Sequence, residues 1–116
     1  MSFGPSTGWT FSRSQVTLAG NTNNLSLPDT MQIHVQGGGF QITGFAGGAA
    51  NRVLVITEIS LAGSTLIHNS GSSTAGNRLI LSLAGNVSIP RWHTVVLIYN
   101  VTDTFWYQLG QVTQLV

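Results

Sequence analysis

The stretch Thr94-Val95-Val96-Leu97-Ile98-Tyr99-Asn100 decides the fold class, because almost every residue in it is β-branched, aliphatic or aromatic. Such residues favour strands, and alternation places Val95, Leu97 and Tyr99 on one face. Working outward, short apolar runs with period two recur along the chain, each bounded by Gly, Asn, Ser or Pro, while helical periodicity is nearly absent. We expect strands over residues 15–18, 31–36, 40–45, 52–61, 65–68, 79–83, 87–89, 94–100, 104–109 and 112–116.

The number of strands determines the architecture that we expect. About eight to ten short strands in a single chain predict an all-β fold, a small antiparallel β-sandwich or jelly roll. The length of 116 residues fits one domain, which we place at residues 25–116. Residues 1–24 are predicted to form an extended N-terminal arm, because Pro5, Gly8, Gly20 and a polar Asn-rich stretch interrupt any regular pattern there. Trp9, Phe11 and Arg13 are the candidate contacts of this arm with a partner, since exposed aromatic rings need a surface to pack on.

Three segments share one local sequence, namely Thr17-Leu18-Ala19-Gly20-Asn21, Ser60-Leu61-Ala62-Gly63-Ser64 and Ser82-Leu83-Ala84-Gly85-Asn86. Gly followed by Asn or Ser suits the positive φ angles of tight turns, so each segment is predicted to end a strand in a hairpin turn. The segments are too short to indicate a solenoid repeat. We therefore interpret them as similar hairpins with similar turn chemistry.

Charged side chains are unusually rare in this chain. They make up 6% of the residues, and there is no lysine, whereas charged residues are about 25% of ordinary soluble domains. Charged residues are depleted where subunits meet, so this composition predicts a homo-oligomer, most simply a homotrimer. A net charge of +1 cannot neutralise many phosphates, which disfavours nucleic acid as a partner.

The chain shows none of the sequence features of exported or membrane proteins. It contains no cysteine and no signal-peptide pattern in its first residues. It also has no apolar run of the roughly 20 residues that a membrane-spanning helix needs. We therefore expect a protein that is made and kept in a cytosol and has no membrane partner.

Few residues of the kinds that carry out catalysis are present. The three acidic residues lie in separate segments, and no serine has the sequence context of a nucleophile. The three histidines match no zinc spacing, although one from each of several subunits could meet on a symmetry axis. The glycine-rich loops lack the Lys-Ser/Thr ending of a phosphate-binding loop. We predict no enzyme, no metal and no cofactor. The acids and histidines concerned are Asp29, Glu58, Asp103, His34, His68 and His93.

Aromatic residues near the C-terminus supply further candidate contacts. Alternation in Phe105-Trp106-Tyr107 sends one ring to one face of a strand and two to the other, so at least one ring is exposed. We favour oligomer contact as the role of Trp92, Trp106 and Tyr107. A platform on which a sugar stacks is the alternative, because aromatic faces serve both purposes.

Several motifs between residues 42 and 106 occur in a distinctive order. Ile42-Thr43-Gly44-Phe45 precedes an apolar run over residues 52–59, and Leu66-Ile67-His68-Asn69-Ser70-Gly71-Ser72-Ser73 leads into Gly76-Asn77-Arg78. The Val-rich run up to Asn100 and then Trp106 complete the series. In this order, the stretch over residues 44–106 resembles a module that recurs in bacteriophage virion proteins, both head-decoration or cement proteins and tail-fibre segments.

The resemblance implies a non-catalytic β-sandwich or jelly-roll unit that is usually trimeric. We expect a capsid cement or decoration protein that binds the major capsid protein as a homotrimer, stabilises the head shell and resides in the virion after synthesis in the host cytoplasm. The alternative is a tail-fibre or receptor-binding module that contacts a host surface glycan. Pro90-Arg91-Trp92-His93 departs from the small turn expected at that point, so no function is carried over for this loop. The arm lies outside the resemblance.

Overall fold

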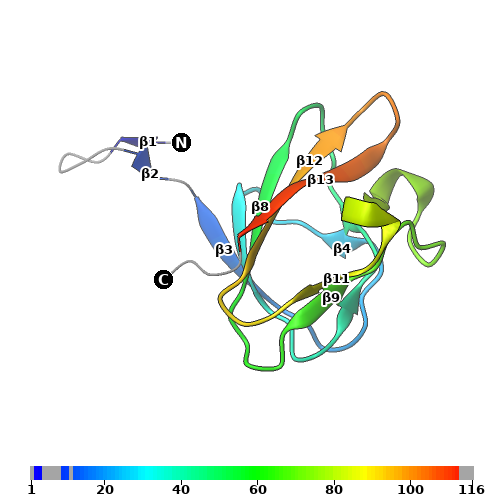
Figure 1. Ribbon diagram of the computed structural model, residues 1–116. Coiled ribbons are helices and arrows are strands. Elements are labelled where there is room, and N and C mark those ends of the chain that lie inside the picture. The colour runs from blue at the N-terminus through cyan, green and yellow to red at the C-terminus, as the bar shows by residue number, and fades with distance from the viewer. Residues whose placement is uncertain (1, 4–8, 11, 113–116) are drawn as a thin grey trace.

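The computed structural model describes residues 2–3, 9–10 and 12–112, and the regular structure in this part of the chain is strand with almost no helix, which confirms the all-β prediction (Figure 1). The only helical elements in these residues are two short 3-10 helices, η1 (Ala75–Asn77) and η2 (Ser82–Ala84). The strands are β1 (Ser2–Phe3), β2 (Trp9–Thr10), β3 (Arg13–Thr17), β4 (Leu25–Ser26), β5 (Gln32–Gln36), β6 (Gln41–Ile42), β7 (Phe45–Ala46), β8 (Val53–Glu58), β9 (Ser64–Leu66), β10 (Leu79–Ile80), β11 (Val87–Ile89), β12 (Thr94–Asn100) and β13 (Phe105–Val112).

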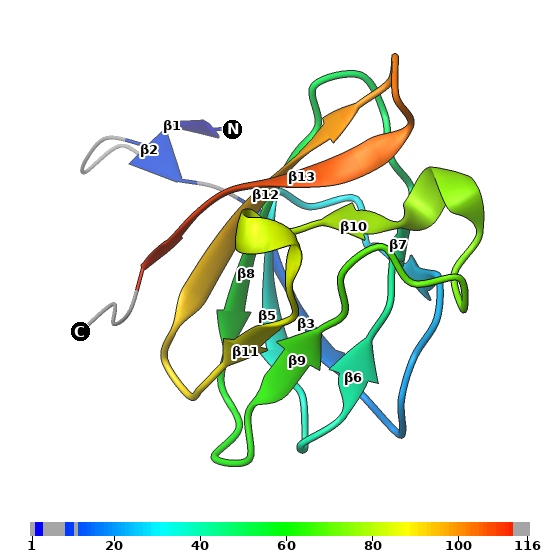
Figure 2. The same ribbon diagram turned by 45° about the vertical axis from the view of Figure 1, so that its right-hand side comes forward.

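The chain winds in successive coils that stack on one another and pass through the same sheets in turn (Figure 2). The first coil contains β3 and β4, the second contains β5, β6 and β7, and the third begins with β8 and β9. In the largest sheet β3, β5 and β8 are parallel neighbours, with Arg13 opposite Gln32 and Gln32 opposite Val55. A second sheet pairs β6 with β9 in parallel, and a third pairs β4 with β7 in parallel. The arrangement is therefore solenoid-like, because each coil contacts mainly the coil before it and the coil after it.

The prediction of antiparallel pairing is wrong for these coils. Consecutive strands such as β5, β6 and β7 lie in three different sheets, and each strand pairs with a counterpart one full coil earlier or later. Parallel pairing needs such a long return path, whereas antiparallel strands can be joined by a two-residue turn. Short apolar runs bounded by turn residues occur in both arrangements, so the period-two pattern could not distinguish them.

The C-terminal third of the chain covers one end of the coils with antiparallel strands. β11 pairs with β9, and β12 pairs with β8 so that Leu97 lies opposite Leu54. β13 then pairs with β12, and β10 adds to the outer edge of β13 in parallel. The large sheet thus has the order β10-β13-β12-β8-β5-β3, with β3 at the opposite end from these closing strands.

The repeated Leu-Ala-Gly segments are not the hairpin turns that the sequence predicts. The first two follow β3 and β8 and turn the chain from the large sheet toward the second sheet. In the second copy Gly63 has a φ of +74°, and a Cβ there would lie 2.9 Å from the carbonyl oxygen of Ile89. Glycine is needed at that corner for both reasons. The third copy forms η2, where Leu83 has a φ of 60° and is fully exposed, so the strand expected over residues 79–83 ends at Ile80.

One hydrophobic core lies between the sheets. Trp106 is completely buried in it, donates its indole N–H to the carbonyl oxygen of Phe45 at 3.0 Å, and contacts the rings of Phe45 and Tyr99 edge-on. Every coil and the closing strands contribute to this core, so no part of the main body packs independently. The buried hydrophobic residues are Leu18, Ile33, Val35, Ile42, Phe45, Leu54, Ile56, Leu66, Leu79, Leu81, Ile89, Val95, Leu97, Tyr99 and Trp106.

The C-terminal half of the predicted N-terminal arm belongs to the main body. β3 pairs with β5 along its whole length, Leu18 is buried, and Thr22 bridges to Ile42 in the second sheet. Val16 packs against the core as well. The arm can therefore comprise at most the residues before Arg13, of which Phe11 lies outside the described residues and Trp9 is described only as part of the backbone of β2.

Candidate functional site

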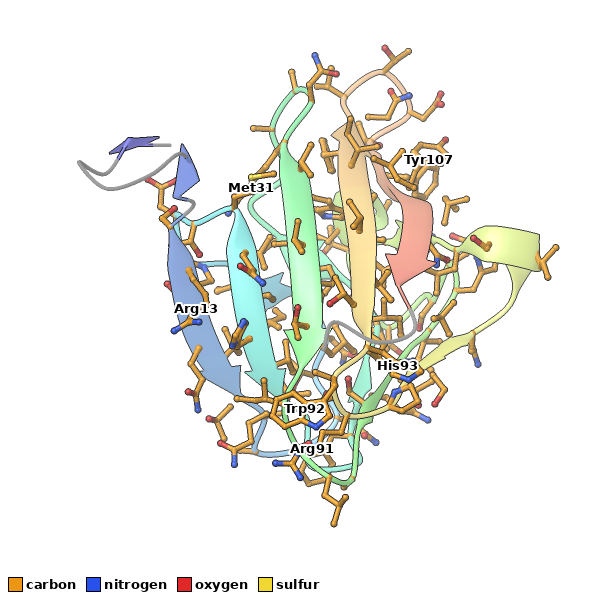
Figure 3. All side chains as sticks on the ribbon, turned by 60° about the vertical axis from the view of Figure 1, so that its left-hand side comes forward. Arg13, Met31, Arg91, Trp92, His93 and Tyr107 are labelled. Carbon is orange, nitrogen blue, oxygen red and sulfur yellow. The ribbon has the colours of Figure 1, made fainter. Side chains whose placement is uncertain are left out.

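The outer face of the large sheet carries apolar side chains over β8, β12 and β13. Val53, Ile98 and Tyr107 lie opposite one another across these three strands, and Val55 lies opposite Val96 in the next row. All five are only partly buried, because alternation turns them away from the core while their neighbours Leu54, Leu97 and Trp106 turn inward. Figure 3 shows these strands from the outer side, with Tyr107 at one end of the face.

The same face is polar over β3 and β5. Gln15 lies opposite His34, which in turn lies opposite Thr57, and the hydroxyls of Thr57 and Thr94 are 2.8 Å apart. Burial lowers the pKa of His34 from its usual value, and the positive charge of Arg13 lowers it further. The outer face therefore has an uncharged apolar half and a hydrogen-bonded polar half whose only charged side chain is Arg13 at the edge.

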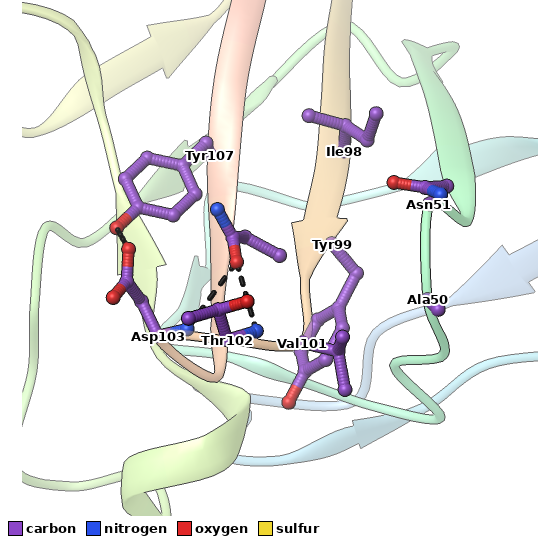
Figure 4. A pocket seen from close by; sticks show the side chains of 9 residues that line it. Ala50, Asn51, Ile98, Tyr99, Val101, Thr102, Asp103 and Tyr107 are labelled. Atoms are coloured by element: carbon purple, nitrogen blue, oxygen red, sulfur yellow. Dashed lines mark hydrogen bonds between the residues drawn. The ribbon is translucent and has the colours of Figure 1, made fainter.

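A hollow of about 570 Å³ lies where β12 turns into β13 (Figure 4). Its walls include Asn51, Tyr99 and Tyr107, and the Tyr107 hydroxyl donates to the carboxylate of Asp103 at 2.9 Å. This hydrogen bond is the main reason that the pKa of Tyr107 is raised. The side-chain oxygen of Asn100 accepts from the backbone N–H groups of the turn at 2.9 and 3.2 Å, which holds the turn in shape. The hollow thus combines an aromatic face with amide and carboxylate oxygens.

Trp92 lies in a strained turn at the other end of the molecule. It has a φ of 71°, it is 40% exposed, and the guanidinium of Arg91 lies 4.4 Å from the centre of its ring. A bulky residue with a positive φ costs free energy and persists where the surroundings hold it. Here the backbone N–H of Trp92 donates to the carbonyl oxygen of Glu58 at 2.8 Å. The turn therefore presents an aromatic ring at a defined position, as a contact residue requires.

The structure separates the candidate contact residues that the sequence grouped together. Trp106 is completely buried within its own chain, so its assignment as an oligomer contact is wrong. Tyr107, its neighbour, lies on the outer face, whereas Trp92 is exposed in the turn that precedes β12. Arg13 is exposed on the edge strand β3. The sequence could show that Trp106 and Tyr107 point to opposite faces but not which of the two faces the core.

A buried carboxyl group was missed by sequence reasoning. Glu58 is completely buried, and its Oε2 accepts hydrogen bonds from the N–H of Gly37 at 3.0 Å and from the N–H and hydroxyl of Ser60 at 2.8 and 2.6 Å. A Cβ on Gly37 would collide with Glu58, so glycine is required there. Glu58 thus joins the corners of two successive coils. Gly37 and Ser60 lie 23 positions apart in the sequence, and no local pattern indicates that both contact Glu58.

The Ser-rich loop that leads into η1 is anchored to the main body. Ser73 is buried, and its hydroxyl lies 2.7 Å from that of Thr43 and accepts from the N–H of Asn24 at 3.0 Å. The side-chain oxygen of Asn24 accepts in turn from the N–H of Thr74 at 2.8 Å. Ser73 and Thr43 therefore have a structural role, which accounts for part of the motif without a ligand.

Within the residues that the structure describes, no cluster of three or more His, Asp or Glu side chains is placed to hold a metal ion. No helix in this same part of the chain has the length and apolar character needed to cross a membrane. Comparison of the chain with models of protein families, with curated proteins and with solved structures finds no match.

Proposed function

We propose that this chain is a non-enzymatic structural protein of a bacteriophage particle, a capsid cement or decoration protein that acts as a homotrimer. In this role it binds the major capsid protein and stabilises the head shell of the virion. The proposal is supported by the order of motifs between residues 42 and 106, by the rarity of charged residues, and by the surfaces of the large sheet. It requires no catalytic group and no cofactor.

One observation carries this proposal, namely the uncharged apolar half of the outer sheet face. The side chains of Val53, Val55, Val96, Ile98 and Tyr107 form a continuous surface that no other described element of the chain covers. Contiguous exposed apolar surface of this kind marks protein contacts. A flat sheet face suits a contact between subunits better than it suits a small ligand, which prefers a concave site.

We also propose how the strands of this unit are layered. A β-sandwich or jelly-roll unit is what the resemblance implies, and sheets that enclose one core support the layered part of that description. The parallel coils depart from a jelly roll. Trimeric association would place the apolar face of each copy against its neighbours.

Measurement of the molar mass in solution tests the assembly. We expect a mass that is a multiple of three times 12.3 kDa for the natural chain, measured by light scattering. Ile98→Asp places a charge on the apolar face and is expected to reduce the mass while the circular dichroism spectrum of the strands is retained. Leu61→Asp makes the same kind of change at a corner that is 85% exposed and should leave the mass unchanged. A monomeric natural chain at micromolar concentration would contradict the assembly.

Co-sedimentation with phage capsids that have been stripped of minor proteins tests the partner. The full chain with Trp9→Ala and Phe11→Ala is expected to keep its molar mass but to bind these capsids less tightly, because the arm is the proposed contact with the shell. Binding to host cells with no binding to capsids would contradict the cement role. Unchanged capsid binding by the double variant would remove the arm from the mechanism.

The hollow beside Tyr107 favours one alternative function, a receptor-binding module that contacts a host surface glycan. Aromatic faces stack on sugars, and the oxygens of Asn51, Asn100 and Asp103 are suitable hydrogen-bond acceptors for sugar hydroxyls. Saturation-transfer NMR with oligosaccharides from the host surface would detect such binding. In that case Tyr107→Ala should abolish the signal, and Trp92→Ala, at the opposite end, should not.

A further inference from the structure

The first coil of the main body begins with a strand, β3, that has one unpaired edge among the described residues. β3 is the last strand of the large sheet, and among the described residues nothing pairs with the side of β3 that faces away from β5. An unpaired edge of this length is a template for another strand, and natural proteins cover such edges or place lysine or proline on them. β3 has the sequence Arg-Ser-Gln-Val-Thr, which contains neither of these residues, and its one charged side chain, Arg13, lies at the start of the strand and not at its centre.

The hydrogen-bond pattern shows which backbone groups are free. Ser12 accepts from the N–H of Gln32 at 3.3 Å, and the N–H of Leu18 donates to Gln36 at 3.1 Å. In a parallel ladder alternate residues of a strand bond to one neighbour, so the even-numbered residues of β3 bond to β5. The N–H and C=O groups of Arg13, Gln15 and Thr17 therefore point toward the free edge.

Apolar side chains are also left partly uncovered at this end. Five hydrophobic residues pack against the core without being fully buried, and three of them, Val16, Leu25 and Leu27, belong to the first coil. At the other end of the coils, β8 and β9 are covered by β12 and β11. Solenoids need such a cap at each end, and the described chain supplies one only at the end formed by its C-terminal third.

We propose that β3 pairs with β3 of a second copy of this chain, antiparallel and across a two-fold axis at Gln15. This register places Arg13 opposite Thr17 of the second copy and Gln15 opposite Gln15, so no two like charges meet. The free N–H and C=O groups of Arg13, Gln15 and Thr17 would form about six backbone hydrogen bonds with their copies. On the inner side Val16 would be covered by the second copy, and the two large sheets would join into one.

This contact goes beyond the proposed trimer, because it uses a sheet edge and not the apolar face. If the trimer proposal holds, pairing through β3 joins two trimers into a hexamer. If the trimer proposal fails, the same pairing gives a dimer. In both cases the contact doubles the number of chains, so its test does not depend on the outcome for the trimer.

Complementary charges at residue 15 test the contact and its register. Gln15→Lys and Gln15→Glu each place like charges opposite one another at the two-fold axis, and each full-length variant is expected to have half the molar mass of the natural chain by light scattering. An equimolar mixture of the two variants is expected to regain the natural mass, because Lys then lies opposite Glu. Two variants that separately keep the natural mass would overturn the proposal, and so would a mixture that does not reassemble.

Two separate proline variants provide a second, independent test. Gln15→Pro removes an N–H that points toward the free edge, so the variant should fold normally and have half the natural mass. Ser14→Pro removes an N–H that bonds to β5, so it should lower the melting temperature. A folded Gln15→Pro variant with the full natural mass would overturn the proposal.

Discussion

The inner and outer sides of β12 and β13 carry similar residues with opposite roles. Tyr99 and Trp106 lie opposite each other on the inner side, where both are buried and their rings are in contact. Ile98 and Tyr107 form the adjacent pair on the outer side, where both remain partly exposed. Their composition does not distinguish the two pairs, since all four residues favour strands. Register alone makes one pair a part of the core and leaves the other for contacts with other molecules.

Stability and assembly therefore depend on opposite sides of the same strands. Substitutions on the inner side should lower the free energy of unfolding, and substitutions on the outer side should mainly affect association. Free energies must be compared at one protein concentration, because association stabilises the folded state.

The largest effect is expected for Trp106→Ala. Loss of this side chain empties the space between Phe45 and Tyr99 and leaves the carbonyl oxygen of Phe45 without its indole donor. We expect a loss of about 3–5 kcal/mol in the free energy of unfolding, measured in urea. Tyr107→Ala, at the next position, is the matched control and should cost less than about 1 kcal/mol. Equal losses for the two variants would show that the register of β13 is wrong.

Leu97→Ala and Ile98→Ala compare the two sides at consecutive positions of β12. Leu97 is completely buried, so its truncation should cost about 2–5 kcal/mol. Ile98 is only partly buried, and its truncation should lower the stability of the isolated chain by a smaller amount. The reverse order is expected for association, which Ile98→Ala should weaken more. Chemical denaturation and light scattering on the same samples give both quantities.

Glu58 is the polar exception on the inner side, and its two simplest variants should differ. Glu58→Ala leaves the three donors of Gly37 and Ser60 without an acceptor, and we expect a loss of about 2–3 kcal/mol. Glu58→Gln keeps one oxygen for these donors but places an amide NH2 where Oε1 is buried without a partner, so it should cost about 1–2 kcal/mol, less than Glu58→Ala. A similar loss in both variants would mean that the negative charge, and not the acceptor oxygen, holds the two corners together.

The smallest effect concerns His34 on the polar half of the outer face. Because the pKa of His34 is lowered in the folded chain, the unfolded chain binds the proton more readily. Its contribution to stability is therefore complete above pH 6.5, the usual pKa of the group, and is lost as the pH falls from there toward the lowered pKa. Melting temperatures of the natural chain and of His34→Gln should diverge in this window. Parallel pH profiles of the two proteins would contradict the assignment.

Much of the secondary structure could be predicted from the sequence. The strands over residues 87–89 and 94–100 match β11 and β12 at both ends, and the segment over residues 31–36 contains β5. Short strands were harder to predict from the sequence. β4 has only two residues, and the run over residues 40–45 is divided into β6 and β7. Gly44 lies at that division, where a Cβ would collide with Ser73, a residue that is distant in the sequence. Such long-range contacts leave no local pattern.

The positions of the candidate contact residues could likewise be predicted only in part from the sequence. Alternation predicted that Trp106 and Tyr107 face opposite sides of a strand, and the structure agrees. The choice between the two sides depends on which face of β13 meets Phe45, and that contact joins residues 61 positions apart. The exposed position of Trp92 depends in the same way on its backbone hydrogen bond to Glu58.

The all-β character of this chain follows from the amino-acid sequence, because residue type and period two act over a few neighbouring positions. The sequence also shows that charged groups are too few to cover the surface as they do in ordinary soluble domains. The stacking of the strands in parallel coils, the choice of core side chains and the edge of β3 that no described residue pairs with depend on long-range contacts. These features arise from pairing between residues about a full coil apart, such as Gln32 with Val55, and the free energy of that pairing depends on all three sheets closing around one core.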